Sequence, residues 1–132
     1  MEQKKTPIGS IVSTDITVDA PKQLIEFYKE VIGWEEEGLL MKDESGTYTD
    51  YVMKDDQGNW IGGICHHRGV NKGIPPQWIV YINVADIKQS IDKCLQLGGK
   101  VIKTSANQDG SLQYAIISDP QGAVLALTQE AY

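Results

Sequence analysis

The feature that most constrains the fold of this chain is an internal repeat. Residues 66 positions apart match along one predicted strand and the helix after it. The matching pairs are Ile16 and Ile82, Val18 and Val84, Lys22 and Lys88, Gln23 and Gln89, Ile25 and Ile91, and Gly33 and Gly99. A second block matches at 64 positions and pairs the turn at 55–58 with the turn at 119–122. Matches in two separate blocks at nearly one spacing indicate a duplicated structural unit.

Each copy has the same order of predicted elements, namely a strand, a helix and three further strands. In the first copy, residues 11–18 alternate like a half-buried strand, and a helix opens at Asp19-Ala20-Pro21 with a capping-type aspartate and ends at Gly33. The other strands of this copy are predicted at 35–40, 47–53 and 60–65. In the second copy the strands fall at 78–84, 101–104, 112–118 and 123–128, with a helix at 86–97 that Gly98-Gly99 stops.

These elements predict an α+β fold in which tandem βαβββ modules carry curved mixed sheets that form an open, barrel-like trough. A single domain covers residues 1–132, with repeats at about 8–65 and 78–129 and a connector at 66–77. A concave site between related modules commonly holds a small ligand. A small organic molecule is therefore the predicted partner.

Composition excludes several classes of function. Twelve Lys and Arg against 18 Asp and Glu give a net charge of -6, the wrong sign for binding nucleic acid or an anionic membrane surface. No stretch approaches the roughly 20 apolar residues that span a bilayer. Two cysteines and two histidines are too few for a four-cysteine zinc site or a disulfide framework. Unpaired cysteines and an amino terminus without a secretory signal predict a cytoplasmic protein.

Strand alternation selects the residues expected to face the trough. If the helix covers Val12, Ile16 and Val18, then the other face of the first strand carries Ser13, Asp15 and Thr17. The corresponding residues of the second copy are Ile79, Tyr81 and Asn83. Asp15 is the only carboxylate that this rule places in the trough. It is predicted either to act as a base or ligand contact, or to be a structural aspartate bonded to neighbouring hydroxyls.

Aromatic side chains supply the other candidate contacts. Tyr51, Tyr81 and Tyr114 are predicted either to stack on an aromatic ligand or to fill the pocket wall. Trp60 is expected to meet a ligand, because the adjacent Gly62-Gly63 pair leaves room for a ligand or another backbone. Trp34 and Trp78 are expected to close gaps in the core. His66 and His67 are expected to be exposed or hydrogen-bonded, with a contact at the rim of the site as the alternative, and both cysteines are expected to be inert.

Three strings carry a family resemblance: DAPKQLIEFYKEVIGW, IPPQW before IVYINVADI, and ISDPQGAVLALTQ. Together they resemble the vicinal oxygen chelate superfamily, which contains glyoxalase I (lactoylglutathione lyase), bleomycin-resistance proteins and extradiol dioxygenases. The resemblance covers about residues 8–129 and is strongest to small bacterial glyoxalase-like proteins with a Pro-Pro-x-Trp connector. It implies the βαβββ fold, and a homodimer is expected because sheet edges in this fold often pair between chains.

The resemblance also implies where a metal would be held. Metal-dependent members bind one divalent ion through four side chains, whose positions fall on Ser13, Gly62, Ile79 and Ala126. Serine is a poor neutral ligand and the other three have no donor, so no metal and no cofactor are expected. The predicted function is metal-free binding of a small organic molecule for sequestration, sensing or an unknown activity. The alternatives are a lyase or isomerase that uses Asp15 as base or an atypically bound divalent metal, and a structural or regulatory domain whose trough is filled by side chains.

Overall fold

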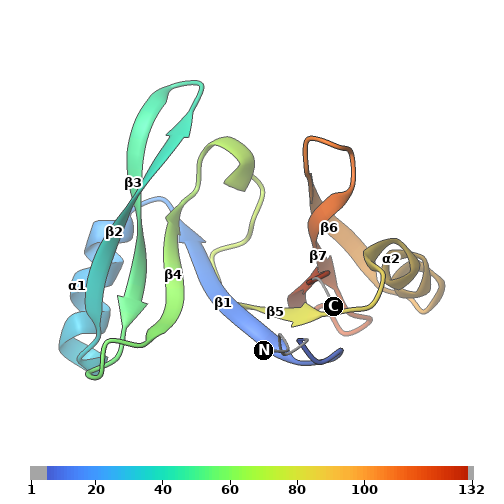
Figure 1. Ribbon diagram of the computed structural model, residues 1–132, viewed down its shortest axis with the longest axis horizontal. Helices are drawn as coiled ribbons and strands as arrows, with labels where there is room; N and C mark the ends of the chain where they lie inside the picture. Colours follow the sequence, from blue (N-terminus) through green and yellow to red (C-terminus); the bar gives the residue numbers. More distant parts are fainter. Residues whose placement is uncertain (1–5, 131–132) are drawn as a thin grey trace, which may run out of the picture. The chain divides into compact units, whose positions relative to one another are not determined.

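A computed structural model describes residues 6–130 and contains eight strands, two α-helices and one short 3-10 helix, η1 (Figure 1). The termini at 1–5, where the sequence predicts no secretory signal, and at 131–132 lie outside the described residues. In chain order the elements are β1 (Ile11–Val18), α1 (Pro21–Ile32), β2 (Glu35–Asp43), β3 (Gly46–Lys54), β4 (Trp60–His66), η1 (Gly69–Asn71), β5 (Ile79–Asn83), α2 (Ile87–Gln96), β6 (Lys100–Ala106), β7 (Leu112–Ser118) and β8 (Val124–Thr128). Every predicted strand and helix is present, with bounds that differ by a few residues.

The contacts divide the chain into two compact units, and the two units share one strand pattern. Thr14–Trp78 form one unit, and residues 6–13 with 79–130 form the other. The first has the strand order β2-β3-β4-β1 and the second β6-β7-β8-β5. In each, one pair is parallel, β1 with β4 and β5 with β8, while the hairpins are antiparallel. The predicted α+β class with two βαβββ modules and mixed sheets is confirmed.

Helix α1 runs along one face of the first sheet and buries its apolar side there (Figure 1). The core under it joins Ile25 of the helix, 1% exposed, to Ile16, Tyr51, Met53 and Ile64 of the strands. Val18, Leu24, Tyr28, Trp34 and Trp78 pack against this core. The indole Nε1 of Trp78 donates a hydrogen bond of 2.7 Å to the Tyr28 hydroxyl. Trp34 and Trp78 thus fill the core, as predicted.

The two helices begin differently, and one predicted cap is wrong. Residue Ala20 occupies the N-cap of α1 and makes no side-chain cap, whereas the Asp19 carboxylate lies 3.4 Å from Nδ1 of His67. Asp19 stands two residues before the first helical residue, one too early for a cap. In α2 the equivalent Asp86 directly precedes Ile87 and accepts a hydrogen bond of 3.2 Å from the backbone N–H of Gln89.

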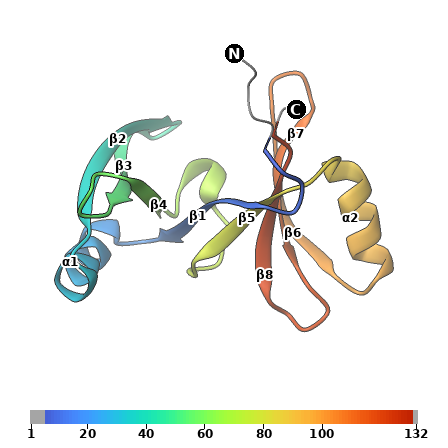
Figure 2. The ribbon, with the colours of Figure 1, turned by 60° about the horizontal axis from the view of Figure 1, so that its bottom comes forward.

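The second unit packs α2 against β6 and β7 (Figure 2). Ile87 of the helix is 1% exposed, and Ala115, Ile117 and Leu127 of the strands are also buried. The fully buried Asn83 attaches the start of the chain to this unit, because its side-chain amide donates to the carbonyl of Thr6 and its backbone exchanges hydrogen bonds with Gly9 and Ser10. Neither helix of the described chain has the length and apolar character needed to cross a membrane.

Candidate functional site

The face of the first sheet turned away from α1 carries a group of polar side chains. The register of the parallel pair sets Asp15 beside Gly63 and Thr17 beside Cys65. Residues paired across strands share a face, so these side chains lie opposite Ile16 and Ile64 of the core. Asp50 of β3 joins them, because its carboxylate accepts a hydrogen bond from the Cys65 thiol. We call the group formed by Asp15, Thr17, Asp50 and Cys65 the distal face; Thr17 and Asp50 are buried in it and the other two are partly exposed.

A β-bulge changes which residue of β4 belongs to the distal face. Lys54 pairs with Trp60 but Met53 pairs with Gly62, which leaves Ile61 as an extra residue. The equivalent part of the second unit is regular, since Ser118 pairs with Val124 and Ile117 with Leu125. Counting four residues from the turn glycine reaches the superfamily's metal position in the second unit, at Ala126. In the first unit the same count ends at Gly62, one residue before the residue equivalent to Ala126.

The register makes Gly63, and not Gly62, the residue equivalent to Ala126, while Gly62 stays a predicted ligand contact. Gly63 lies opposite Asp15 as Ala126 lies opposite Tyr81. A Cβ on Gly62 would lie 3.0 Å from the carbonyl oxygen of Thr14 and 3.2 Å from the Trp78 ring. Atoms of Thr14 and Trp78 therefore lie close to the position that a Cβ at residue 62 would take.

Two predicted aromatic contacts of the first unit have different surroundings. Tyr51 is 8% exposed and belongs to the core beneath α1, on the side of the sheet opposite Asp15. This position argues against a ligand contact, because register pairs Tyr51 with the core residue Ile64. Trp60 is 62% exposed at the first position of β4 and is accessible to a ligand.

A hydrogen-bonded cluster surrounds the buried carboxylate of Asp50, which is 4% exposed. One carboxylate oxygen accepts the backbone N–H of His66 at 2.8 Å and lies 3.2 Å from Nδ1 of the same residue. Burial raises the pKa of the Cys65 thiol strongly, and the charges of Asp15 and Asp50 add to the increase. The raised pKa favours the protonated thiol, which is the less reactive form, and the inertness of Cys65 stays a prediction.

The cluster continues into an aromatic and cationic stack. His66 contacts the ring of Tyr48 edge to face at 5.4 Å, and the guanidinium carbon of Arg68 lies 4.2 Å above the same ring. Nε and Nη2 of Arg68 donate to the two oxygens of Asp43 at 2.6 and 2.9 Å. This fork lowers the pKa of Asp43, whereas burial, followed by the charges of Asp50 and Asp43, raises the pKa of Tyr48.

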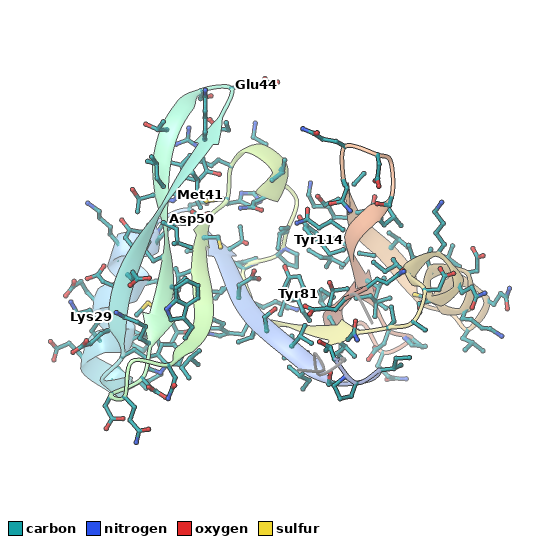
Figure 3. All side chains as sticks on the ribbon, viewed as in Figure 1. Lys29, Met41, Glu44, Asp50, Tyr81 and Tyr114 are labelled. Carbon is teal, nitrogen blue, oxygen red and sulfur yellow. The ribbon has the colours of Figure 1, made fainter. Side chains whose placement is uncertain are left out.

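Arg68 and Tyr48 line a hollow of about 740 Å³. Residues 41–45 of the β2–β3 hairpin and residues 69, 70 and 72 of the connector complete it. Figure 3 labels Glu44 at the tip of this hairpin and Met41 and Asp50 further along it. The volume lies within the roughly 300–1,000 Å³ of small-molecule sites. We call it the hairpin hollow.

The predicted site residues of the second unit are mostly apolar. Ile79 and Ala126 are fully buried. Tyr81 pairs in register with Ala126, and its ring meets the ring of Tyr114 edge to face at 6.0 Å (Figure 3). Ser13 is exposed near the end of the amino-terminal segment of this unit. The structure thus brings Tyr81, Tyr114 and Ala126 together.

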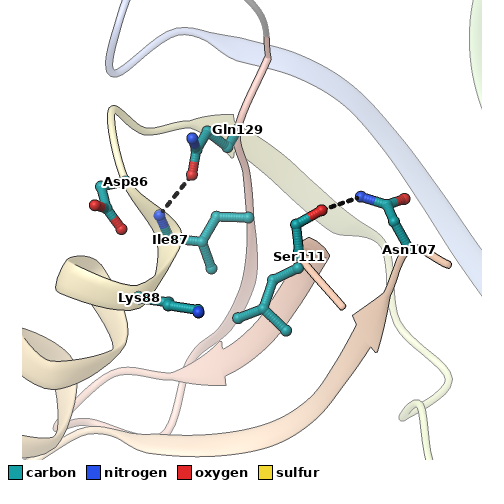
Figure 4. Close-up of a pocket in the computed structure, with 7 residues that line it drawn as sticks. Asp86, Ile87, Lys88, Asn107, Ser111 and Gln129 are labelled. Carbon is teal, nitrogen blue, oxygen red and sulfur yellow. Dashed lines mark hydrogen bonds between the residues drawn. The ribbon is translucent and has the colours of Figure 1, made fainter. Parts of the chain in front are cut away.

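A smaller hollow of about 320 Å³ lies at the start of α2 (Figure 4). Polar groups of four lining residues already bond to one another in pairs. The backbone N–H of Ile87 donates to Oε1 of Gln129 at 3.0 Å, and Nδ2 of Asn107 donates to Oγ of Ser111 at 3.0 Å. These bonds make it a weaker candidate than the hairpin hollow.

Residues 12–128 match the family model of the glyoxalase-like domain. This chain belongs to the glyoxalase-like domain family. The predicted resemblance to the vicinal oxygen chelate superfamily is thereby confirmed.

Comparison with individual proteins agrees with this assignment. The glyoxalase-like chain is 27% identical over 123 residues to "Putative glyoxylase CFP32" of Mycobacterium bovis, and identically so to the protein of that name in Mycobacterium tuberculosis. The match covers 93% of this chain and 45% of the relative, so the chain spans less than half the length of these curated relatives.

Two solved structures share the fold. Methylmalonyl-CoA epimerase of Streptomyces coelicolor superposes with a TM-score of 0.52 at 14% identity, covering 96% of this chain and 100% of that one. Glyoxalase I of Zea mays superposes with a TM-score of 0.54 at 20% identity, covering 94% of this chain and 46% of that one. At these identities the likeness concerns the fold alone.

The residues at the superfamily's metal positions do not fit a divalent ion. With the bulge taken into account they are Ser13, Gly63, Ile79 and Ala126, of which only serine has a side-chain donor. Within residues 6–130, no group of three or more His, Cys, Asp or Glu side chains is arranged to hold a metal. The four superfamily positions therefore give no basis for a metal-dependent step.

Sequence reasoning missed the Asp43–Arg68 fork and the Asp50 cluster. The fork joins the last residue of β2 to a connector residue 25 positions later, and no periodic pattern indicates such a contact. Asp50 did leave a signal, because Tyr48, Asp50 and Val52 alternate with the core residues Tyr51 and Met53 along β3.

The fork predicts a pH dependence of stability. Arg68 lowers the pKa of the Asp43 carboxyl in the folded state below its value of about 3.9 in the unfolded chain. The ion pair between Asp43 and Arg68 therefore stabilises the fold above about pH 3.9, and this stabilisation is lost as the pH falls through the lower pKa of the folded state. Asp43→Asn should therefore be less stable than the natural protein at pH 7, and the difference should shrink between pH 4 and pH 2. Urea denaturation at each pH measures it. A difference that stayed constant down to pH 2 would contradict the assignment.

Proposed function

We propose that this glyoxalase-like protein binds a small organic molecule without a divalent metal at the superfamily positions. Sequestration or sensing is the proposed use, in the cytoplasm. The observation that carries the proposal is the donor set, because three of the four positions have no side-chain donor in an otherwise intact fold. Members of the family share a fold that binds ligands, and the residues at the four superfamily metal positions of this chain lack the side-chain donors that a metal-dependent reaction would need.

Within the first unit, the proposed contacts are Asp15 and Thr17 of the distal face, with Trp60 at the edge of β4. Asp15 is partly exposed, and its neighbour Gly63 has no side chain to cover it. A carboxylate accepts hydrogen bonds only, so the proposed ligand presents a hydroxyl or amine to Asp15. In the second unit Ser13, Tyr81 and Tyr114 stay predicted ligand contacts. Ile79 and Ala126 stay predicted as an apolar wall of the site, and the trough between the repeats is also a prediction.

An enzyme is the second candidate function. Asp15 and Asp50 both act electrostatically on Cys65, so the distal face carries two carboxylates close to one thiol. A positioned carboxylate can abstract a proton from a bound substrate, which is the role proposed for Asp15 in a lyase or isomerase. An Asp15→Asn variant that kept full turnover on an identified substrate would remove this mechanism.

A second copy of this chain is the proposed protein partner. β2 forms the edge of its sheet and exposes Leu39, Leu40 and Met41, of which Leu40 is 78% exposed. An apolar edge strand is a template for pairing with another strand. A monomeric mass by light scattering at working concentration would contradict the proposed dimer.

The central test uses protein purified from cells without chelator. Elemental analysis should find no stoichiometric divalent metal, and mass spectrometry after denaturation should find a co-purified small molecule. Asp15→Asn should lose most of that molecule, whereas Asp56→Asn, an exposed turn residue, should retain it. One bound metal per chain would contradict the metal-free proposal, and equal retention by Asp15→Asn would contradict the site.

A further inference from the structure

We propose that the hairpin hollow binds a small organic anion, a carboxylate or phosphate ester with an apolar body. Its volume of about 740 Å³ is suited to such a molecule, and all of its lining comes from the unit Thr14–Trp78. None of its residues is among Asp15, Thr17 and Trp60. The inference therefore stands apart from the proposed function, and either can fail without the other.

The charge of the lining selects an anion. Three cations, Lys42, Arg68 and Lys72, line the hollow together with two acids, Asp43 and Glu44. The fork from Arg68 satisfies Asp43, and the positive charge of Lys72 also lowers the pKa of that carboxyl. Asp43 is thus already neutralised by its neighbours. The lining remains net positive by one charge, although the whole chain carries -6.

Arg68 is fixed in a way that suits it to recognition. The Asp43 carboxylate holds one edge of the guanidinium and the Tyr48 ring lies under its plane, 4.2 Å from the guanidinium carbon. A guanidinium has five N–H donors, and the hydrogen bonds described for residues 6–130 use two of them on the Arg68 side chain. Its side chain is 32% exposed. Asp43 acts here as a positioning residue, because it orients the donors without contacting the ligand.

Apolar groups beside the cations supply a surface for the body of the ligand. Met41 and Val70 line the hollow and are 37% and 69% exposed. Tyr48, which is half-buried, adds part of an aromatic ring. A carboxylate or phosphate that carries an aryl or alkyl group would cover these side chains while its charged end met Arg68.

Gly69 shows how closely the connector packs against the fork. It has a φ of +58°, and a Cβ there would lie 3.1 Å from Cβ of Asp43. The connector and the hairpin therefore pack closely against each other in the lining of the hollow. A merely structural clasp between these two segments is the competing explanation of the fork, and the experiment has to separate it from ligand binding.

The test is a titration of the full chain, labelled with nitrogen-15, with benzoate, phenyl phosphate and benzamide. Benzoate and phenyl phosphate should shift the amide signals of residues 41–48 and 68–72 saturably, and the relative strength of the two distinguishes carboxylate from phosphate. Benzamide keeps the ring without the charge and should bind about tenfold more weakly. Equal binding of benzoate and benzamide, or shifts confined to Asp15 and Thr17, would overturn the proposal.

Amino-acid substitutions distinguish a ligand-binding role of the hollow from a purely structural role of the Asp43–Arg68 fork. Lys42→Gln and Lys72→Gln remove charge at exposed positions and should weaken benzoate binding several-fold, while circular dichroism shows that both variants stay folded. Arg68→Lys keeps the charge but loses the two-pronged geometry and should weaken binding about tenfold. Lys29→Gln, which lies outside the hollow and removes an ion pair with Glu36, is the matched control. Unchanged affinity in both lysine variants would overturn the proposal, even if Arg68→Lys proved unstable.

Discussion

Asp50→Ala is expected to lower the free energy of unfolding by about 3 kcal/mol, because it removes a buried hydrogen-bond acceptor from the centre of the first unit. The carboxylate is 4% exposed and accepts the His66 backbone N–H at 2.8 Å. Alanine would leave this N–H without its partner and would open a gap beside Cys65. The contact with Nδ1 of His66 would also be lost, which frees the imidazole that packs against Tyr48.

Two further variants show whether the acceptor itself causes the loss. Asp50→Asn keeps the volume and one carbonyl oxygen, so it should cost about 1 kcal/mol. Asp56→Ala, in the exposed turn between β3 and β4, should change stability by less than about 0.5 kcal/mol. Urea denaturation followed by circular dichroism measures all three. If Asp50→Ala proved as stable as Asp56→Ala, the Asp50 cluster would have no structural role.

The fold could be predicted because the signals that specify it are local and repeated. Alternation along β1 separated Ile16 and Val18 from Asp15 and Thr17, and the structure keeps that division. The bulge at Ile61 could not be predicted, because one extra residue in a strand leaves the apolar pattern on both sides intact. Because of the bulge, the superfamily's metal position on β4 falls on Gly63 and not on Gly62. Both residues are glycine, so the argument that this position has no side-chain donor for a metal is the same in either register.

The candidate site was less predictable because its contacts join distant segments. Asp43 and Arg68 meet only once the β2–β3 hairpin and the connector are folded. Nothing in the sequence pattern pairs these two charged residues, and the sequence predicts for 66–77 only a connector between the repeats. Tyr51 shows the reverse case. It was considered as a ligand contact because of its residue type, but its position in the strand places it in the core.

Residues that are identical in the two repeats can have different structural roles. Gly33 and Gly99 match in the sequence, yet only Gly33 has a left-handed φ, of +90°, and ends its helix. In the second unit Gly98 takes the left-handed conformation, with a φ of +94°. Gly99 instead lies where α2 passes close to β7. A Cβ there would lie 2.8 Å from the carbonyl oxygen of Ser118 and 2.5 Å from Sγ of Cys94.

Gly99→Ala is therefore expected to cost about 2 kcal/mol of unfolding free energy. The Cys94 side chain can turn aside, but the Ser118 carbonyl is part of β7 and moves only with the strand. Overpacking of this kind typically costs about 1–3 kcal/mol, and the loss of chain entropy in the unfolded alanine variant offsets up to about 1 kcal/mol of it.

Gly38→Ala is the matched control, because Gly38 also has no left-handed φ and its added Cβ would meet only the Thr49 methyl group, at 3.0 Å. That methyl belongs to a side chain that can rotate, so the control should lose less than about 0.5 kcal/mol. Urea denaturation of both variants decides the matter. Equal stability would mean that α2 shifts away from β7 at little cost and that the close approach of the two elements does not require a glycine at position 99.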